Sequence, residues 1–283
     1  MRSEYKNIHF IGIDGAGMTP LALHSAKTGY TVTGSDLKDD NFSQLKKAGV
    51  SVKKGHSEIP DNTDLVVYSA AVKEDNAELT DAGKKNIECV KRAKFLAKIT
   101  KDHRSILISG SHGKSTTSVM LADMVNGLFP FYASAIIGAE SVSINSNYYA
   151  GKGDHVIVEA DEYDKSFLQL DPDDLVILNI DNDHLDIYHT TERLKAAFCE
   201  LAAKLKKDSL LVYNLDDMHS VSVAETAKCR HAGFGIKNRS GYYALDIEFK
   251  NMRTSFDLYR SGKYLSKIEY VYTGMHNVYN MLA

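Results

Sequence analysis

The segment at residues 105–117, SILISGSHGKSTT, has the residue types and spacing of a phosphate-binding loop. Its apolar run at 106–108 predicts a buried strand, and the residues from Ser115 onward predict a helix. The loop between them would direct backbone N–H groups and a helix N-terminus at an anion. Lys114 could reach the β- and γ-phosphates of a nucleotide, and the Ser115 hydroxyl could ligate Mg²⁺. The segment therefore predicts a nucleotide-phosphate site.

This loop is shorter than the common phosphate-loop pattern. That pattern, G-x-x-x-x-G-K-[ST], needs a glycine where this chain has Ile108. The glycines that are present, Gly110 and Gly113, allow a tight turn and a close approach to a ligand. An ordinary strand–turn–helix without a ligand is the alternative interpretation.

Acidic side chains follow two further expected strands, at 155–158 and 175–180. Glu159 and Asp161 come after the first strand. The second is followed by DNDHLD, which contains Asp183, His184 and Asp186. Parallel sheets bind ligands beyond the carboxyl ends of their strands, and Mg²⁺ prefers oxygen ligands. We therefore predict that Glu159 ligates Mg²⁺, whereas His184 would be an unusual Mg²⁺ ligand and could instead orient a water or a carboxylate. The alternatives are a solvated acidic loop and a hydrogen-bonded structural histidine.

A second glycine-rich turn follows the first expected strand, at residues 8–13. Its glycines, Gly12, Gly15 and Gly17, form G-x-x-G-x-G rather than the dinucleotide pattern G-x-G-x-x-G. Asp36 follows the next strand, as an acid does in dinucleotide-binding proteins. These features predict a nucleotide or UDP-sugar site, and a tight turn without a ligand is the alternative.

The composition is that of a globular protein with one large or two ordinary domains. The chain has 283 residues, of which 43% are hydrophobic and 25% charged, and its net charge is −3. This charge argues against non-specific nucleic-acid binding. Cys89, Cys199 and Cys229 lie far apart, which favours a reduced, cytoplasmic protein. No apolar run reaches the length of a membrane span, and the N-terminus lacks the apolar core of a signal peptide.

Alternating strand and helix patterns predict an α/β fold with a parallel sheet in each half. The polar segment at 100–104 precedes a second series of such units, so we predict domains at 1–101 and 102–283. The runs YYALDIEF and RTSFDLY alternate like antiparallel strands and predict an antiparallel addition to the second domain. The chain ends in an expected helix, MHNVYNMLA, without a stop signal, and we expect it to be cut from a longer protein.

Seven motifs together resemble the Mur ligase family, and they cover almost the whole chain in the order in which the family has them. They are IHFIGIDGAGM, YSAAVKEDNAEL, RAKFLAKI, GSHGKSTT, EADEYDKSFL, NIDNDHLD and GMHNVYNMLA. The resemblance implies an ATP-dependent amide ligase of peptidoglycan precursor synthesis. It also implies an N-terminal Rossmann-like domain for a UDP-sugar and a central ATP-binding domain. The closing C-terminal domain of the family would be absent here, so we expect this chain alone to have little ligase activity.

The resemblance also implies roles for individual residues. Those implied near the UDP-sugar are Gly15, Ala16, Gly17 and Met18 at the diphosphate, Asp36 at the uridine end, and Ser69 and Asn76. Those implied at ATP are Gly110, Ser111, His112, Gly113, Lys114, Ser115 and Thr116, with His276, Asn277 and Asn280 on the adenine side. Those implied at metals are Ser115, Glu159 and, for a second ion, His184. The chain departs from the family at Pro20 and at Asp14, whose charge would repel a diphosphate.

The implied reaction joins L-alanine to UDP-N-acetylmuramate. The muramyl carboxylate would attack the γ-phosphate of ATP to give an acyl phosphate and ADP, and the amine would then displace phosphate. Lys114, Glu159 and His184 would be the catalytic residues, with ATP and Mg²⁺ as cofactors. The alternatives are a ligase that attaches a recycled murein peptide, a non-catalytic UDP-sugar or ATP-binding module, and an NAD(P)-dependent oxidoreductase.

Overall fold

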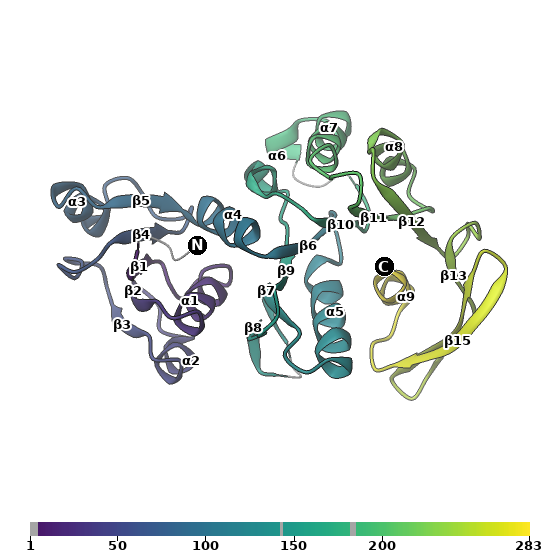
Figure 1. The fold of residues 1–283 in the computed structure, drawn as a ribbon, viewed down its shortest axis with the longest axis horizontal. Coiled ribbons are helices and arrows are strands. Elements are labelled where there is room, and N and C mark those ends of the chain that lie inside the picture. The colour runs from purple at the N-terminus through teal and green to yellow at the C-terminus, as the bar shows by residue number, and fades with distance from the viewer. Residues whose placement is uncertain (1–4, 142–143, 182–184) are drawn as a thin grey trace.

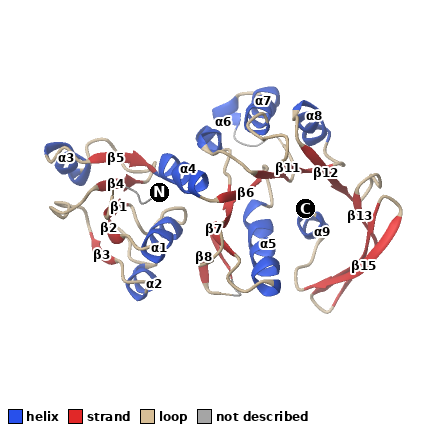
Figure 2. Cartoon of the chain, viewed as in Figure 1, coloured by secondary structure: helices blue, strands red, loops and turns tan. Residues whose placement is uncertain are grey.

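The structure is a computed structural model that describes residues 5–141, 144–181 and 185–283 (Figure 1). Two sheets lie side by side in this part of the chain, one with five strands and one with ten (Figure 2). The strands of the first sheet all precede those of the second along the chain. This arrangement confirms the predicted α/β fold with a parallel sheet in each half.

The first sheet is fully parallel, with the strand order β3-β2-β1-β4-β5. Its central strands are apolar because both faces are covered by helices, as expected for parallel sheets. Its strands are β1 (Asn7–Ile11), β2 (Thr31–Asp36), β3 (Ser51–Lys54), β4 (Leu65–Tyr68) and β5 (Glu88–Lys91). Its helices are α1 (Thr19–Lys27), α2 (Phe42–Lys47) and α3 (Ala77–Lys84).

The second sheet has the order β15-β14-β13-β12-β11-β10-β6-β9-β7-β8. Its parallel centre consists of β6 (Arg104–Ser109), β7 (Ala133–Ser141), β9 (His155–Glu159), β10 (Asp174–Ile177), β11 (Leu210–Asn214) and β12 (Arg230–Gly235). Antiparallel strands flank this centre: β8 (Ser146–Tyr149) at one edge, and β14 (Arg253–Arg260) and β15 (Lys263–Tyr270) at the other. The predicted antiparallel addition is therefore confirmed, and it joins the centre through β13 (Tyr242–Lys250), which pairs parallel with β12.

Helices cover both faces of this second sheet (Figure 1). They are α5 (Lys114–Leu128), α6 (Leu185–Tyr188), α7 (Thr191–Ala202), α8 (Met218–Thr226) and α9 (Met275–Leu282), with a 3₁₀ segment, η1 (Tyr163–Gln169). Each helix in the described part of the chain is too short or too polar to span a bilayer.

The two sheets meet through α4 (Arg92–Asp102), which leads from β5 into β6, and through α1, which packs on the β7–β8 hairpin. Hydrogen bonds cross this seam, from Asn147 Nδ2 to the Ala16 carbonyl (3.1 Å) and between Tyr148 and His24 (3.3 Å). Apolar side chains of both sheets belong to one continuous core. The predicted domain boundary falls at the end of α4, and the division into two folding units stays a prediction.

Candidate active site

The phosphate loop, residues 110–115, joins β6 to α5 and has the predicted strand–loop–helix geometry. Gly110 and Gly113 have φ angles of 137° and 89°, which residues with side chains rarely adopt. Asn179, beyond β10, fixes the middle of the loop: its Oδ1 accepts from the His112 N–H (2.8 Å), and its Nδ2 donates to the His112 carbonyl (2.9 Å). A neighbouring strand end therefore holds the loop in shape, through a residue that the sequence interpretation did not assign.

Lys114 begins α5, and its ammonium group is held at the loop itself. Its Nζ donates to the Gly110 carbonyl (2.7 Å) and lies 2.9 Å from Glu162 Oε2. The Lys114 side chain is 12% exposed and that of Glu162 is 0% exposed, so this is a buried ion pair. Glu162 belongs to the EADE motif but was not predicted as a site residue, because nothing in the local sequence shows that its side chain turns toward Lys114.

Ser115 and Glu159 lie together, as the sequence predicts. Ser115 Oγ donates to Glu159 Oε1 (2.7 Å), and Glu159 Oε2 accepts from the Gly138 N–H (2.7 Å). The serine hydroxyl and the carboxylate are hard oxygen donors beside a phosphate loop, and Mg²⁺ commonly takes one or two such ligands with waters and phosphate oxygens. These two residues therefore fit a magnesium ion bound together with a nucleotide. Among the described residues, no group of three or more His, Cys, Asp or Glu could hold a metal by itself.

The helix α9 brings a distant segment against the phosphate loop. The side chain of Asn280 lies so close to Gly113 that a Cβ there would overlap its amide oxygen. Asn280 Nδ2 donates to Asn277 Oδ1 (3.1 Å), both asparagines are buried, and His276 is exposed. Thr116 lies on the first turn of α5, behind the loop. The structure thus places the predicted asparagines beside the loop, and their contact with a nucleotide stays a prediction.

Gly113→Ala is expected to lower nucleotide affinity about tenfold and to destabilise the protein by roughly 1–2 kcal/mol. A methyl group at this left-handed position would strain the backbone and overlap Asn280. Calorimetry with a non-hydrolysable ATP analogue measures the affinity. Gly127→Ala is the control, because Gly127 lies in the last turn of α5, away from the loop, with nothing within 4 Å of its added Cβ. Equal affinity in the two variants would contradict the role given to Gly113.

On the first sheet, a cavity of about 550 Å³ lies beyond the strand ends and is lined by Asp36, Ser69 and Asn76. Asp36 accepts backbone N–H groups from Asp14 (2.9 Å) and Lys38 (3.0 Å). An ionised carboxylate has about four acceptor positions, so Asp36 can also accept from a ligand hydroxyl. Asn76 caps α3 by accepting from the Glu78 N–H (2.9 Å), which gives it a structural role as well.

The carboxylate of Asp14 is directed toward the start of α2. Its oxygens accept from the N–H groups of Asp40 (3.1 Å) and Asn41 (2.6 Å). These bonds stabilise the carboxylate, which also lines the Asp36 cavity. The repulsion expected between Asp14 and a diphosphate stays a prediction.

Glu78 is buried beneath this cavity with polar partners. It accepts from His56 Nδ1 (2.9 Å) and from the Ser35 hydroxyl, and His9 lies 3.6 Å away. Burial by itself would raise the pKa of Glu78, but hydrogen bonds from His9, Ser35 and His56 lower this pKa below its usual value. The charged carboxylate therefore holds His56 at the cavity wall. His56 was not assigned to the site from the sequence.

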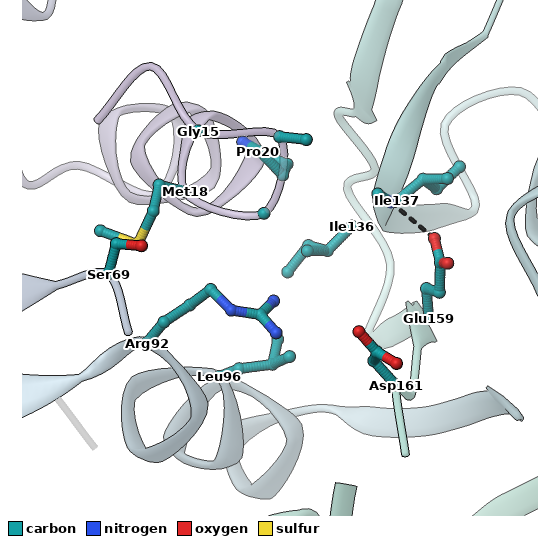
Figure 3. A pocket seen from close by; sticks show the side chains of 13 residues that line it. Gly15, Met18, Pro20, Ser69, Arg92, Leu96, Ile136, Ile137, Glu159 and Asp161 are labelled. Carbon is teal, nitrogen blue, oxygen red and sulfur yellow. Dashed lines mark hydrogen bonds between the residues drawn. The ribbon is translucent and has the colours of Figure 1, made fainter. Parts of the chain in front are cut away.

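A second cavity, of about 370 Å³, lies between the two sheets (Figure 3). The glycine turn forms one side with Gly15, Ala16, Gly17 and the buried Met18, and Glu159 and Asp161 form the other. The structure thus brings the predicted diphosphate residues of the glycine turn and the predicted magnesium ligand Glu159 to one cavity. The sequence interpretation missed five residues that line it: Arg92, Leu96, Ile136, Ile137 and Gly138.

Asp183 and the predicted metal-binding residue His184 lie outside the described residues. The metal-binding and catalytic roles of His184 therefore stay predictions.

Two family models match this chain. The model described as the Mur ligase middle domain matches residues 108–283, and the one described as the Mur ligase family, catalytic domain, matches residues 7–104.

Curated relatives match over the whole chain. The UDP-N-acetylmuramate–L-alanine ligase of Sorangium cellulosum is 38% identical over 286 residues, which cover 100% of this chain and 60% of the relative. That of Clostridium acetobutylicum is 39% identical over 289 residues, covering 98% and 61%. The chain thus spans about 60% of the length of these relatives.

Solved structures have the same fold. The UDP-N-acetylmuramate–alanine ligase of Thermotoga maritima gives a TM-score of 0.84 at 28% identity and covers 98% of this chain and 63% of that one. The UDP-N-acetylmuramate:L-alanyl-gamma-D-glutamyl-meso-diaminopimelate ligase of Neisseria meningitides gives 0.85 at 23% identity, covering 98% and 91%. At 23% identity, the similarity to the Neisseria meningitides structure shows a shared fold alone.

Proposed function

The chain belongs to the Mur ligase family, and from this premise we propose that it serves the ATP-dependent joining of L-alanine to UDP-N-acetylmuramate. The names of the relatives support this pair of substrates. One observation carries the proposal: Glu159, whose carboxylate is hydrogen-bonded to Ser115 of the phosphate loop, faces the glycine turn across one cavity. A nucleotide at the loop and a sugar nucleotide at the turn would meet there.

The proposed reaction passes through an acyl phosphate. The muramyl carboxylate attacks the γ-phosphate of ATP, ADP leaves, and the amine of L-alanine then displaces phosphate. Lys114 holds positive charge at the loop where the phosphates bind, and Ser115 and Glu159 would hold Mg²⁺ beside them. A bound Mg²⁺ would neutralise phosphate charge during the transfer. The protein contributes mainly position and electrostatic stabilisation, as in other phosphoryl transfers.

The sugar nucleotide would extend from the cavity at Asp36 into the cavity between the two sheets. The cavity at Asp36 would receive the uridine, and the glycine turn at 15–18 would lie at the diphosphate. Because Gly15, Ala16 and Ser69 line both cavities, the sugar would continue toward Glu159. An NAD(P)-dependent oxidoreductase would leave the phosphate loop without a role. We place the reaction in the cytoplasm, where ATP and UDP-sugars are available.

The proposal is tested with UDP-N-acetylmuramate and a non-hydrolysable ATP analogue in calorimetry. Both ligands are expected to bind. The ATP analogue should saturate the Lys114 loop, and UDP-N-acetylmuramate should saturate the Asp36 cavity, each without the other ligand present. Turnover by this chain alone is expected to be low. Mass spectrometry of any product formed with ATP and either L-alanine or the tripeptide L-alanyl-γ-D-glutamyl-meso-diaminopimelate distinguishes the two acceptor classes. Product from the tripeptide alone would favour the peptide-ligase alternative, and no binding of the sugar nucleotide would refute the proposal.

Glu159→Gln is expected to raise the Mg²⁺ concentration needed for half-maximal nucleotide binding about tenfold. The amide keeps one oxygen near Ser115 but loses the charge that attracts the cation. Titration of Mg²⁺ at fixed nucleotide analogue gives this concentration. Asp154→Asn is the matched control, since this exposed acid lies just before the other end of β9. The same Mg²⁺ dependence in both variants would mean that Glu159 is not a ligand.

A further inference from the structure

Arg92 is the first residue of α4, and its side chain extends into the cavity between the sheets (Figure 3). The guanidinium of Arg92 makes no hydrogen bond and no ion pair with any of the described residues, 5–141, 144–181 and 185–283. The group is half-buried and carries five N–H donors in a planar fork that matches a carboxylate or a phosphate. Its donors are therefore available to a ligand in this cavity.

The side chain of Arg92 packs against the glycine turn. A Cβ on Gly17 would lie 2.8 Å from Arg92 Nη1 and 3.2 Å from its Cδ and Cζ. The arginine thus lies across the backbone of Gly17, in space that the absence of a Cβ at this position leaves open. A side chain at position 17 would shift the guanidinium from this place.

The charges around the cavity favour an anion at Arg92. Among the described residues that line it, Arg92 is the one cation, and the acids are Glu159 and Asp161. Neither acid forms an ion pair with Arg92, and the oxygens of Glu159 are bonded to Ser115 and Gly138. The positive charge therefore lies opposite the magnesium ligand, with the cavity between them.

The positions of the two cavities indicate which anion would bind at Arg92. Residues of the glycine turn, together with Ser69, line both the cavity at Asp36 and the one at Arg92. A diphosphate at the turn would place the uridine on the Asp36 side and the sugar on the Arg92 side. We propose that Arg92 binds the carboxylate of an acidic sugar nucleotide and aims it at the phosphate held by Lys114, an inference that rests on the proposed function.

This contact would also select the substrate. A bidentate pair of arginine and carboxylate is directional and stronger than a neutral hydrogen bond, and a sugar without the acid would leave the guanidinium unsatisfied. The chain would then prefer the acidic sugar nucleotide to its neutral counterpart. Lysine would replace arginine poorly, since an ammonium lacks the planar fork.

The test compares the affinities of UDP-N-acetylmuramate, UDP-N-acetylglucosamine and UDP for the parent chain, Arg92→Met and Arg92→Lys. The neutral sugar lacks the carboxylate, and UDP retains only the diphosphate. We expect Arg92→Met to weaken binding of the acidic sugar nucleotide at least about tenfold and to change the other two less than about twofold. Arg92→Lys should lie between the parent and Arg92→Met.

Lys94→Met is the matched control, because Lys94 is an exposed cation on the same helix. Equal losses for all three ligands would place the diphosphate at Arg92 and overturn the assignment to the sugar acid. Unchanged affinities in Arg92→Met, or in Arg92→Lys should the first variant not fold, would also overturn it. If the parent chain binds none of the three ligands, the proposed function fails together with this inference.

Discussion

Lys114→Met is expected to abolish measurable binding of an ATP analogue and to lower the free energy of unfolding by roughly 3 kcal/mol. The loss of affinity follows from removal of the positive charge at the phosphate loop. The loss of stability follows from the ion pair with Glu162, whose side chain is 0% exposed and whose Oε2 lies 2.9 Å from Lys114 Nζ. Methionine keeps most of the aliphatic part of lysine, so packing changes little.

A second substitution separates these two effects. In Lys114→Met/Glu162→Gln the buried carboxylate is replaced by a neutral amide, so much of the lost stability should return. Nucleotide binding should not return, because the ammonium is still absent. Urea unfolding followed by circular dichroism gives the stability, and calorimetry gives the affinity. Recovery of binding in the double variant would show that Lys114 acts only by balancing Glu162.

The phosphate loop could be predicted from sequence because its information is local. An apolar strand, two glycines and a helix that starts with Lys114 all lie within residues 105–117. The same holds for the glycine turn at 15–18 and for the strand that ends at Glu159. Such segments carry their own periodicity and turn residues, so they are visible without tertiary contacts.

The partners of these residues could not be predicted in this way, because tertiary folding brings them together. Glu162 reaches Lys114 across 48 positions of the chain, and Asn179 reaches His112 across 67. The orientation of Arg92 depends on its packing against Gly17. No local pattern distinguishes these side chains from ordinary surface residues of a helix or loop.

The strand β12 and the helix α8 were missed for another reason. The sequence of β12, RHAGFG, is poor in β-branched residues and contains two glycines. The helix α8, MHSVSVAET, has serines where a helix predicted from sequence would need stronger helix formers. Their positions follow from the parallel pairing of β12 with β11 and from burial of Val223 and Ala224 in the core.

Acidification from about pH 7.5 to about pH 4.5 is expected to destabilise the parent protein more than the variant His24→Gln. His24 lies on α1 at the seam between the sheets and is 4% exposed. Its Nδ1 faces the Tyr148 hydroxyl at 3.3 Å, and its ring centroid lies 5.5 Å from that of His103. Burial, and then the proximity of His103, lower the pKa of His24 from 6.5 to about 4.

The direction of the effect follows from this lowered pKa. As the pH falls below 6.5, the unfolded chain takes up a proton at His24, whereas the folded protein does so only near pH 4. The contribution of His24 to stability is therefore fully present above pH 6.5, is lost as the pH falls toward 4, and is constant below that. The difference between the pKa of 6.5 in the unfolded chain and about 4 in the folded protein corresponds to roughly 3 kcal/mol of unfolding free energy.

Urea unfolding of parent and variant at both pH values measures this effect. Glutamine can still bond to Tyr148 but does not titrate, so the parent should lose more stability on acidification than His24→Gln by up to roughly 3 kcal/mol. Groups that do not interact with His24 titrate equally in both proteins and cancel in the comparison. His231→Gln, at an exposed histidine, is the control and should lose as much stability as the parent. An equal loss in parent and His24→Gln would mean that His24 already takes up its proton in the folded protein at ordinary pH, and that the seam tolerates its charge.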